Sequence, residues 1–248
     1  MNQRRRGIYL LPNLLTTAAL FAGFYAIIAA IQARYEAAAI AIFVAMILDG
    51  MDGRIARLTD TASDFGVQYD SLSDMSSFGI APALVMYEWS LHAWGKPGWV
   101  AAFLYAAATG LRLARFNTQA AVADKGFFQG LPSPAAAALI AAAVWLGDWS
   151  GLDNGTGLVL LTLPLTVAAG ILMVSNIRYH SFKKLDLRNR VPFIAVLVVV
   201  LVFAFIGSEP PLVLFLVALA YAASGPAFTL LALRRHRESR KPAAGPPE

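Results

Sequence analysis

The sequence predicts an all-α protein, a polytopic bundle of transmembrane helices. Of its 248 residues, 58% are hydrophobic and only 14% are charged, whereas a soluble domain carries about 25% charged residues. The apolar residues are gathered in runs of roughly 20, the length at which a helix crosses the hydrocarbon core of a bilayer. The absence of cysteine excludes disulfides, thiolate metal sites and cysteine nucleophiles.

Eight membrane helices are expected, and the fifth and seventh are short for a complete span. Their ranges are 13–33, 36–58, 64–88, 97–117, 133–148, 156–175, 191–207 and 211–233. The first follows three arginines and is longer than the apolar region of a signal peptide, so it is interpreted as a start-transfer helix. An even number of spans places both termini on the same side of the membrane.

The distribution of charge predicts which side that is. With these helices, every lysine and arginine except Arg34 and Lys96 falls on the side of the N-terminus. The positive-inside rule therefore predicts a multi-pass protein of the cell (inner) membrane with both termini in the cytoplasm. The five tryptophans fall near the opposite interface, as an aromatic belt would.

Four carboxylates lie next to the apolar runs at the predicted cytoplasmic side. Asp49 and Asp52 belong to the helix predicted over 36–58, and Asp70 and Asp74 to the next one. On a helix the first pair lies about 60° apart and the second pair about 40° apart, so each pair shares a face. Ionisable groups beside hydrocarbon are costly and usually mark a function. Two adjacent helices facing each other would bring all four carboxylates to one point.

Carboxylates gathered in this way repel one another, and divalent cations would relieve the repulsion. Ligands that are all oxygen suit Mg²⁺, Mn²⁺ or Ca²⁺ rather than Zn²⁺, and a pair of ions suits phosphoryl displacement. Gly53 and Gly66 lack a Cβ atom, which allows a substrate or a second helix to approach the backbone. Arg57 is placed to meet a phosphate. Ser63 or Asp64 is expected to cap the helix that follows.

The stretch from Asp49 to Asp74 resembles the signature of the CDP-alcohol phosphatidyltransferases. The signature's fixed positions are all matched, by Asp49, Asp52, Gly53, Ala56, Arg57, Gly66, Asp70 and Asp74. The resemblance implies a six-helix transmembrane core over 13–190, which in this family usually forms a homodimer. The remainder divides into a basic cytoplasmic N-terminus (1–12), two additional transmembrane helices (191–233) and a basic cytoplasmic tail (234–248).

Four further stretches resemble the membrane-embedded (type II) phosphatidylserine synthases within this family. They are residues 12–16, 70–82, 112–117 and 130–134. The resemblance implies an enzyme of phospholipid biosynthesis that transfers the phosphatidyl group of CDP-diacylglycerol to L-serine and releases CMP. Its partners would be these substrates and membrane lipid, and no nucleic acid is expected.

The resemblance also implies roles for individual residues. Asp49, Asp52 and Asp70 correspond to the ligands of two metal ions, Mg²⁺ or Mn²⁺. Asp74 corresponds to the general base, which also touches the second metal. The positions that contact CDP-diacylglycerol are Gly53, Ala56, Arg57 and Gly66, together with Thr16 and Ser63.

The serine pocket is a separate expectation, and its candidates are Arg112, Arg115 and Asn117 at the cytoplasmic end of the fourth helix. A guanidinium can bind the carboxylate of serine in a bidentate manner. The alternative interpretation is that these arginines only mark the cytoplasmic side of the membrane.

Two other functions stay open at this point. A phosphatidylglycerophosphate, phosphatidylinositol phosphate or phosphatidylcholine synthase would share the chemistry and differ in the acceptor. A phosphorylated acceptor would require cations near Asp74, and the residues Met75 to Gly79 supply none. A cation transporter would use the carboxylates as an ion site, but such sites usually lie at the midplane of the bilayer, between inverted repeats.

Overall fold

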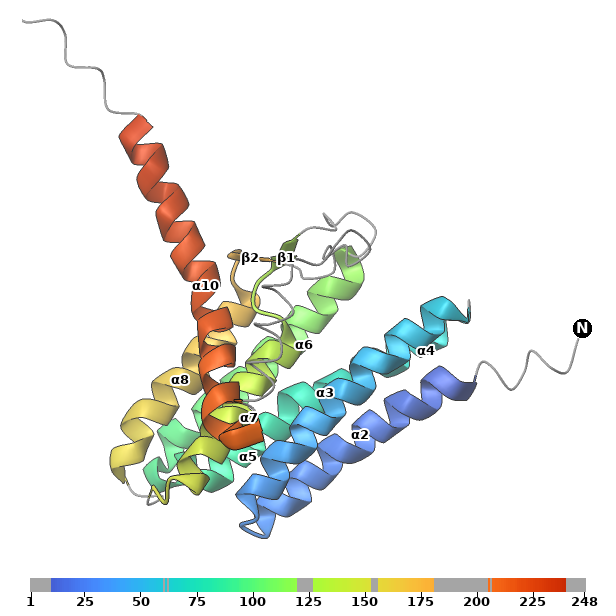
Figure 1. Ribbon diagram of the computed structural model, residues 1–248, viewed down its shortest axis with the longest axis horizontal. Coiled ribbons are helices and arrows are strands. Elements are labelled where there is room, and N and C mark those ends of the chain that lie inside the picture. Colours follow the sequence, from blue (N-terminus) through green and yellow to red (C-terminus); the bar gives the residue numbers. More distant parts are fainter. Residues whose placement is uncertain are drawn as a thin grey trace, which may run out of the picture.

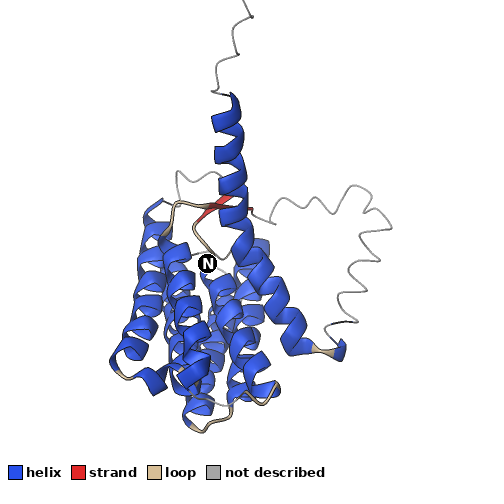
Figure 2. Cartoon of the chain, turned by 90° about the vertical axis from the view of Figure 1, so that its left-hand side faces the viewer, coloured by secondary structure: helices blue, strands red, loops and turns tan. Residues whose placement is uncertain are grey.

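A computed structural model describes residues 10–59, 61, 63–119, 127–152, 156–180, 205 and 207–239. The described helices run side by side as a bundle, and the end of the last helix extends out of it (Figure 1 and Figure 2). In chain order the elements are α2 (Leu10–Ile31), α3 (Tyr35–Leu58), α4 (Asp64–Asp74), the π-helix η1 (Met75–Ile80), α5 (Ala81–Trp89), the 3₁₀-helix η2 (Leu91–Trp94), α6 (Lys96–Gln119), β1 (Phe127–Gln129), α7 (Ser133–Trp149), α8 (Thr156–Val174), β2 (Arg178–His180) and α10 (Pro210–Ser239).

The predicted all-α class is confirmed, apart from one short two-stranded ribbon. The predicted helices that fall on described residues are present, with starts and ends close to the expected positions, and α10 continues past 233 to Ser239. The helix predicted over 64–88 is one helical run whose middle, η1, has π rather than α winding. The helix predicted over 191–207 lies, apart from residues 205 and 207, outside the described residues.

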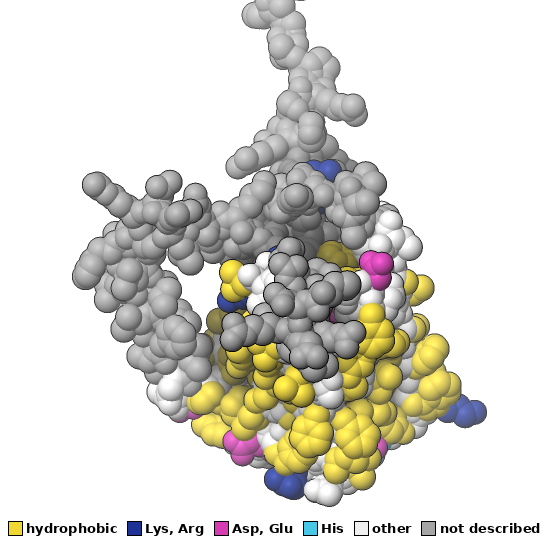
Figure 3. Space-filling model, turned by 90° about the vertical axis from the view of Figure 1, so that its right-hand side faces the viewer, with side chains coloured by type: hydrophobic (Ala, Val, Ile, Leu, Met, Phe, Trp, Pro, Cys, Tyr) yellow, Lys and Arg dark blue, Asp and Glu magenta, His cyan; other side chains and the backbone are white. Residues whose placement is uncertain are grey.

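Of the described helices, two are long and apolar enough to cross a membrane by length and composition. They cover Leu11–Ile31 and Pro210–Leu231, while Ser133–Trp149 and Leu158–Val174 are shorter apolar helices. Most of the coloured side chains in Figure 3 are hydrophobic, and large apolar side chains of α2 such as Phe21 and Phe24 are more than half exposed. An exposed apolar surface of this extent is typical of contact with lipid. The number of membrane spans stays a prediction.

Small residues form much of the core and let the helices approach closely. Among the described elements, α2 and α3 make the most extensive contact with each other, and Ala26, Ala29, Ala38 and Ala39 are fully buried in the core. Lipid gives little hydrophobic drive for association between helices, so close van der Waals packing of small side chains supplies it.

The two-stranded ribbon was not predicted from the sequence. Strands β1 and β2 pair antiparallel with Phe128 opposite Tyr179. The buried Tyr179 hydroxyl donates to the carbonyl oxygen of Ala222 in α10 at 2.9 Å, and a Cβ atom at Gly225 would collide with the Tyr179 ring. The ribbon thereby fixes α10 against the rest of the bundle.

Candidate functional site

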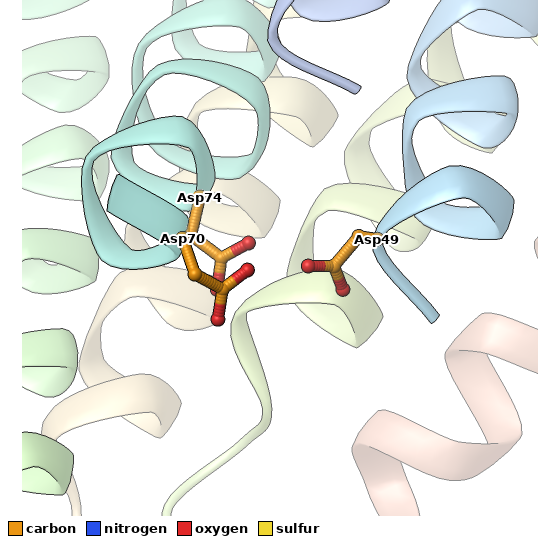
Figure 4. Close-up of side chains that lie close together, drawn as sticks. All are labelled: Asp49, Asp70 and Asp74. Carbon is orange, nitrogen blue, oxygen red and sulfur yellow. The ribbon is translucent and has the colours of Figure 1, made fainter. Parts of the chain in front are cut away.

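Three of the predicted metal-binding carboxylates meet between α3 and α4. One oxygen from each of Asp49, Asp70 and Asp74 lies within 4.8 Å of the others. Figure 4 shows the Asp49 carboxylate, on α3, facing the carboxylates of Asp70 and Asp74. These three residues are called the acidic triad below.

The helical run that carries Asp70 and Asp74 contacts α3 through η1 and α5 more than through α4 itself. In the described structure α4 packs mainly against α2, and its contact with α3 is slight. The Ser73 hydroxyl donates to the carbonyl oxygen of Thr16 in α2 at 3.1 Å, and Thr17 and Tyr69 share a hydrogen bond of 2.9 Å. These bonds to α2 hold α4 so that Asp70 and Asp74 face Asp49.

The fourth predicted carboxylate, Asp52, has different surroundings. Its side chain is buried, and the Thr16 hydroxyl lies 2.6 Å from its Oδ2 atom as a hydrogen-bond donor. Asp52 follows Asp49 by three residues on α3, so it stands beside the acidic triad rather than within it. The sequence did not predict that Thr16 would contact an aspartate.

A cavity of about 200 Å³ opens beside the acidic triad. Its lining residues are Pro12, Asn13, Thr16, Asp52, Gly53, Ala56, Arg57, Thr61, Ser63, Gly66, Val67 and Asp70. All six residues predicted to contact CDP-diacylglycerol are among them. Pro12, Asn13, Thr61 and Val67 were not singled out, although the first two belong to a stretch that resembles the phosphatidylserine synthases.

The glycines and the cap of α4 shape this cavity. Among the described residues, no atom lies within 4 Å of a Cβ atom built on Gly53, so its bare backbone borders the cavity rather than a second helix. The Ser63 hydroxyl accepts a hydrogen bond from the Gly66 N–H at 3.1 Å and caps α4. Of the two capping candidates, Ser63 is therefore the cap. Arg57 is exposed and lines the cavity.

The predicted serine-pocket residues lie in three different environments. Arg112 interacts electrostatically with Asp74, and its Nη1 atom donates to the Ser133 hydroxyl at 2.8 Å. It is the candidate that the structure brings to the acidic triad. Its Nε atom is buried and has no hydrogen-bond partner in the described part of the chain.

The other two candidates, Asn117 and Arg115, form hydrogen bonds with other side chains. The amide of Asn117 donates to the Ser71 hydroxyl at 2.9 Å, one residue beyond Asp70. Arg115 donates to the side-chain oxygen of Asn176 at 2.7 Å, near the end of α8. The structure therefore does not gather Arg112, Arg115 and Asn117 around one point.

The chemistry of the acidic triad fits a hard divalent cation. Carboxylate oxygens are the preferred ligands of Mg²⁺ and Mn²⁺. The Oδ1 atom of Asp70 is buried without a hydrogen-bond partner among the described residues, and an oxygen of this kind is available to a bound ion or water. The triad can therefore hold a divalent metal, which would balance the like charges of Asp49, Asp70 and Asp74.

Comparison with known proteins identifies the family of this chain. Residues 9–175 match the family described as CDP-alcohol phosphatidyltransferase. The chain belongs to this family. The matched segment contains the acidic triad, Asp52 and all twelve cavity residues. Family membership and the apolar helices together indicate a membrane protein.

Three similar proteins are described by the same enzyme name. The chain is 39% identical over 197 residues to a CDP-diacylglycerol–serine O-phosphatidyltransferase of Helicobacter pylori strain 26695, covering 79% of this chain and 82% of that protein. It is 37% identical over 228 residues to the protein so described in Mycobacterium tuberculosis strain H37Rv, covering 88% and 78%. For Methanocaldococcus jannaschii the identity is 34% over 166 residues, covering 67% and 72%.

Proposed function

We propose that this protein is a phosphatidylserine synthase, which transfers the phosphatidyl group of CDP-diacylglycerol to the hydroxyl of L-serine and releases CMP. The observation that carries the proposal is the position of the acidic triad beside a cavity lined by all six predicted nucleotide-contacting residues. The common description of its relatives in three distant organisms supports the choice of acceptor.

The metal ligands would be Asp49, Asp70 and Asp74, with Asp52 as the fourth. Two Mg²⁺ or Mn²⁺ ions, when bound, would neutralise the diphosphate and orient it for displacement. The hydrogen bond from Thr16 fixes the orientation of Asp52 at the cavity wall. Gly53, Ala56 and Gly66 would allow the cytidine diphosphate to approach the backbone, and Arg57 would supply a positive charge for it.

Asp74 would act as the general base. It takes the proton of the serine hydroxyl as the serine oxygen forms its bond to the β-phosphorus, the phosphorus that carries the diacylglycerol. The bond from that phosphorus to the oxygen it shares with CMP breaks, and CMP leaves with the electron pair. A single displacement of this kind inverts the configuration at phosphorus. General-base catalysis by a positioned side chain contributes about 10²–10⁴ in rate.

Arg112 is the strongest candidate for binding the carboxylate of serine, because it alone of the three candidates interacts with Asp74. Replacing it with lysine removes the bidentate fork while keeping the charge. Arg112→Lys should therefore raise the KM for serine by about tenfold or more, with little change in the KM for CDP-diacylglycerol. Arg115→Lys is the matched control, since Arg115 bonds to Asn176 instead. Equal effects of both variants would contradict a serine-binding role specific to Arg112.

The arrangement in the membrane is part of the proposal. A multi-pass protein with both termini and the active site in the cytoplasm would receive serine from the cytosol and CDP-diacylglycerol from the inner leaflet. The six-helix core over 13–190, the further helices over 191–233 and a homodimer are expected from the family resemblance. The charge distribution supports the orientation.

An assay of CMP release by the purified protein in detergent tests the function. Serine should support release in the presence of Mg²⁺ or Mn²⁺, and glycerol 3-phosphate, inositol phosphate and choline should not. Release with glycerol 3-phosphate but not with serine would replace the proposed acceptor. Metal flux into protein-containing liposomes without CDP-diacylglycerol would instead support a cation transporter.

A further inference from the structure

The helical run that carries Asp70 and Asp74 changes its winding directly after Asp74. Residues Met75–Ile80 form the π-helix η1, in which the Ala81 N–H bonds to the carbonyl oxygen of Ser76, five residues earlier. No residue of η1 lines the cavity or has a role in the proposed chemistry. Single π turns are rare and occur frequently at functional sites, so this one requires an explanation.

The π turn sets the direction in which the aspartates point. At 100° per residue, a uniform α-helix would place the pair Asp70 and Asp74 roughly 90° away from the mean direction of Val85, Met86 and Trp89. These three side chains of α5 are buried in the core. One extra residue within a turn removes about 100° of rotation. The π turn therefore puts the aspartates on the side of the run that faces the protein interior and Asp49.

Specific hydrogen bonds hold the π turn. The Phe78 carbonyl has no donor four residues later, because that residue is Pro82, which has no N–H. The fully buried Tyr105 of α6 donates its hydroxyl to this carbonyl at 3.0 Å. On the other side of the turn, the Ser77 hydroxyl donates to the carbonyl oxygen of Ala19 in α2 at 3.1 Å.

The packing around η1 leaves it little freedom. A Cβ atom at Gly23 of α2 would collide with Ser77, and one at Gly79 would lie 3.2 Å from the side chain of Thr109 in α6. Helices α2 and α6 thus approach η1 from two sides at glycine contacts. The bond from Tyr105 to Phe78 is a polar link between α6 and this segment.

We propose that Tyr105 is a positioning residue for the metal site. By donating to the Phe78 carbonyl it holds the π turn, and the π turn keeps Asp70 and Asp74 directed at Asp49. The inference deepens the proposed function and rests on it, because it takes metal binding by the acidic triad as its starting point. Tyr105 itself touches neither metal nor substrate.

The test compares two tyrosines that make the same kind of hydrogen bond to the same helical run. Tyr35 donates its hydroxyl to the Glu88 carbonyl oxygen at 3.0 Å, at the end of the run far from the triad. Mn²⁺ binding to purified Tyr105→Phe and Tyr35→Phe is measured by electron paramagnetic resonance without substrate, together with the Tm of each. Loss of the Tyr105 bond should raise the Kd for Mn²⁺ by about fivefold or more. Tyr35→Phe should bind Mn²⁺ like the wild type, even where its Tm falls equally.

The outcomes separate the inference from the proposed function. Unchanged Mn²⁺ affinity in Tyr105→Phe, or an equal loss in both variants, would overturn the positioning role. Wild-type protein that binds Mn²⁺ but releases no CMP with serine would contradict the proposed acceptor, while a selective loss in Tyr105→Phe would still support the inference. Wild-type protein that binds no Mn²⁺ would overturn the inference, whatever its acceptor.

Discussion

The two ends of the helical run from Asp64 to Trp89 are built in opposite ways. At the α5 end, a Cβ atom at Gly147 of α7 would collide with the ring of Trp89, which fills the space that the glycine leaves. At the α4 end, no described atom lies within 4 Å of a Cβ atom at Gly53, and the space belongs to the cavity. The same residue type thus serves helix packing at one end and leaves room for a ligand at the other.

The polar groups at the two ends of the run differ in their chemistry. Ser90 and Thr162 are buried near Trp89 and share a hydrogen bond of 2.8 Å. At the α4 end, the buried Oδ1 atom of Asp70 has no partner among the described residues. The Nε1 atom of Trp89 at the α5 end is also buried without a partner among the described residues. The two ends therefore differ in the chemistry of the unpaired group, because a carboxylate is a ligand for a hard cation and a neutral indole N–H is not. Substitutions at each end test this contrast.

The largest effect is expected at the acidic triad. Asp74→Asn removes the proposed base while preserving the shape of the side chain, so turnover should fall by at least about 10²–10⁴. Binding of CDP-diacylglycerol should remain largely intact, because Asp49, Asp52 and Asp70 remain to hold the ions. CMP release and equilibrium binding of CDP-diacylglycerol measure the two effects separately. Near-normal turnover would remove Asp74 from the role of base.

A substitution at the α5 end should change the stability of the protein rather than its activity. Gly147→Ala forces a methyl group against Trp89, and overpacking of this kind costs about 1–3 kcal/mol. The Tm in detergent should fall, while the KM values of the protein that remains folded should not change. A Gly147→Ala protein with a normal Tm and an altered KM for either substrate would contradict the distinction between the two ends.

The smallest effect is expected at Gly53. Gly53→Ala adds a methyl group at the cavity wall and should weaken CDP-diacylglycerol binding by about 1 kcal/mol, roughly fivefold. Stability should stay level or rise slightly, because alanine is the better helix former. Gly50→Ala is the matched control: Gly50 is on the same helix with nothing described within 4 Å, but it does not line the cavity. Equal KM values for the two variants would show that the nucleotide does not approach Gly53.

Much of the fold and of the site follows from the sequence for physical reasons that operate locally. The length of the apolar run and its flanking polar residues set α3, predicted over 36–58 and found at Tyr35–Leu58. The spacing of Asp70 and Asp74 places both on one face of α4, and both join the acidic triad. The six residues predicted by resemblance to contact the nucleotide line one cavity because they flank these aspartates on α2, α3 and α4.

The features that the sequence did not predict depend on contacts between distant segments. The ribbon pairs Phe128 with Tyr179, and two strands of three residues give no periodic signal of their own. The π turn at η1 depends on Tyr105 of α6, although Pro82 marks a place where the α-helical hydrogen bonds are interrupted. Arg115 was grouped with Arg112 by its position in the chain, and its partner Asn176 lies beyond α8.

The central claim is that the acidic triad and the cavity form one site, in which bound ions help to hold the diphosphate. Binding of CDP-diacylglycerol to the wild type and to Asp49→Asn, each with Mn²⁺ and with a chelator, tests this claim most directly. Mn²⁺ should tighten binding to the wild type by about tenfold or more, because the ion neutralises the phosphates, and should have little effect on Asp49→Asn. Wild-type affinity that is the same in Mn²⁺ and in chelator would contradict the claim.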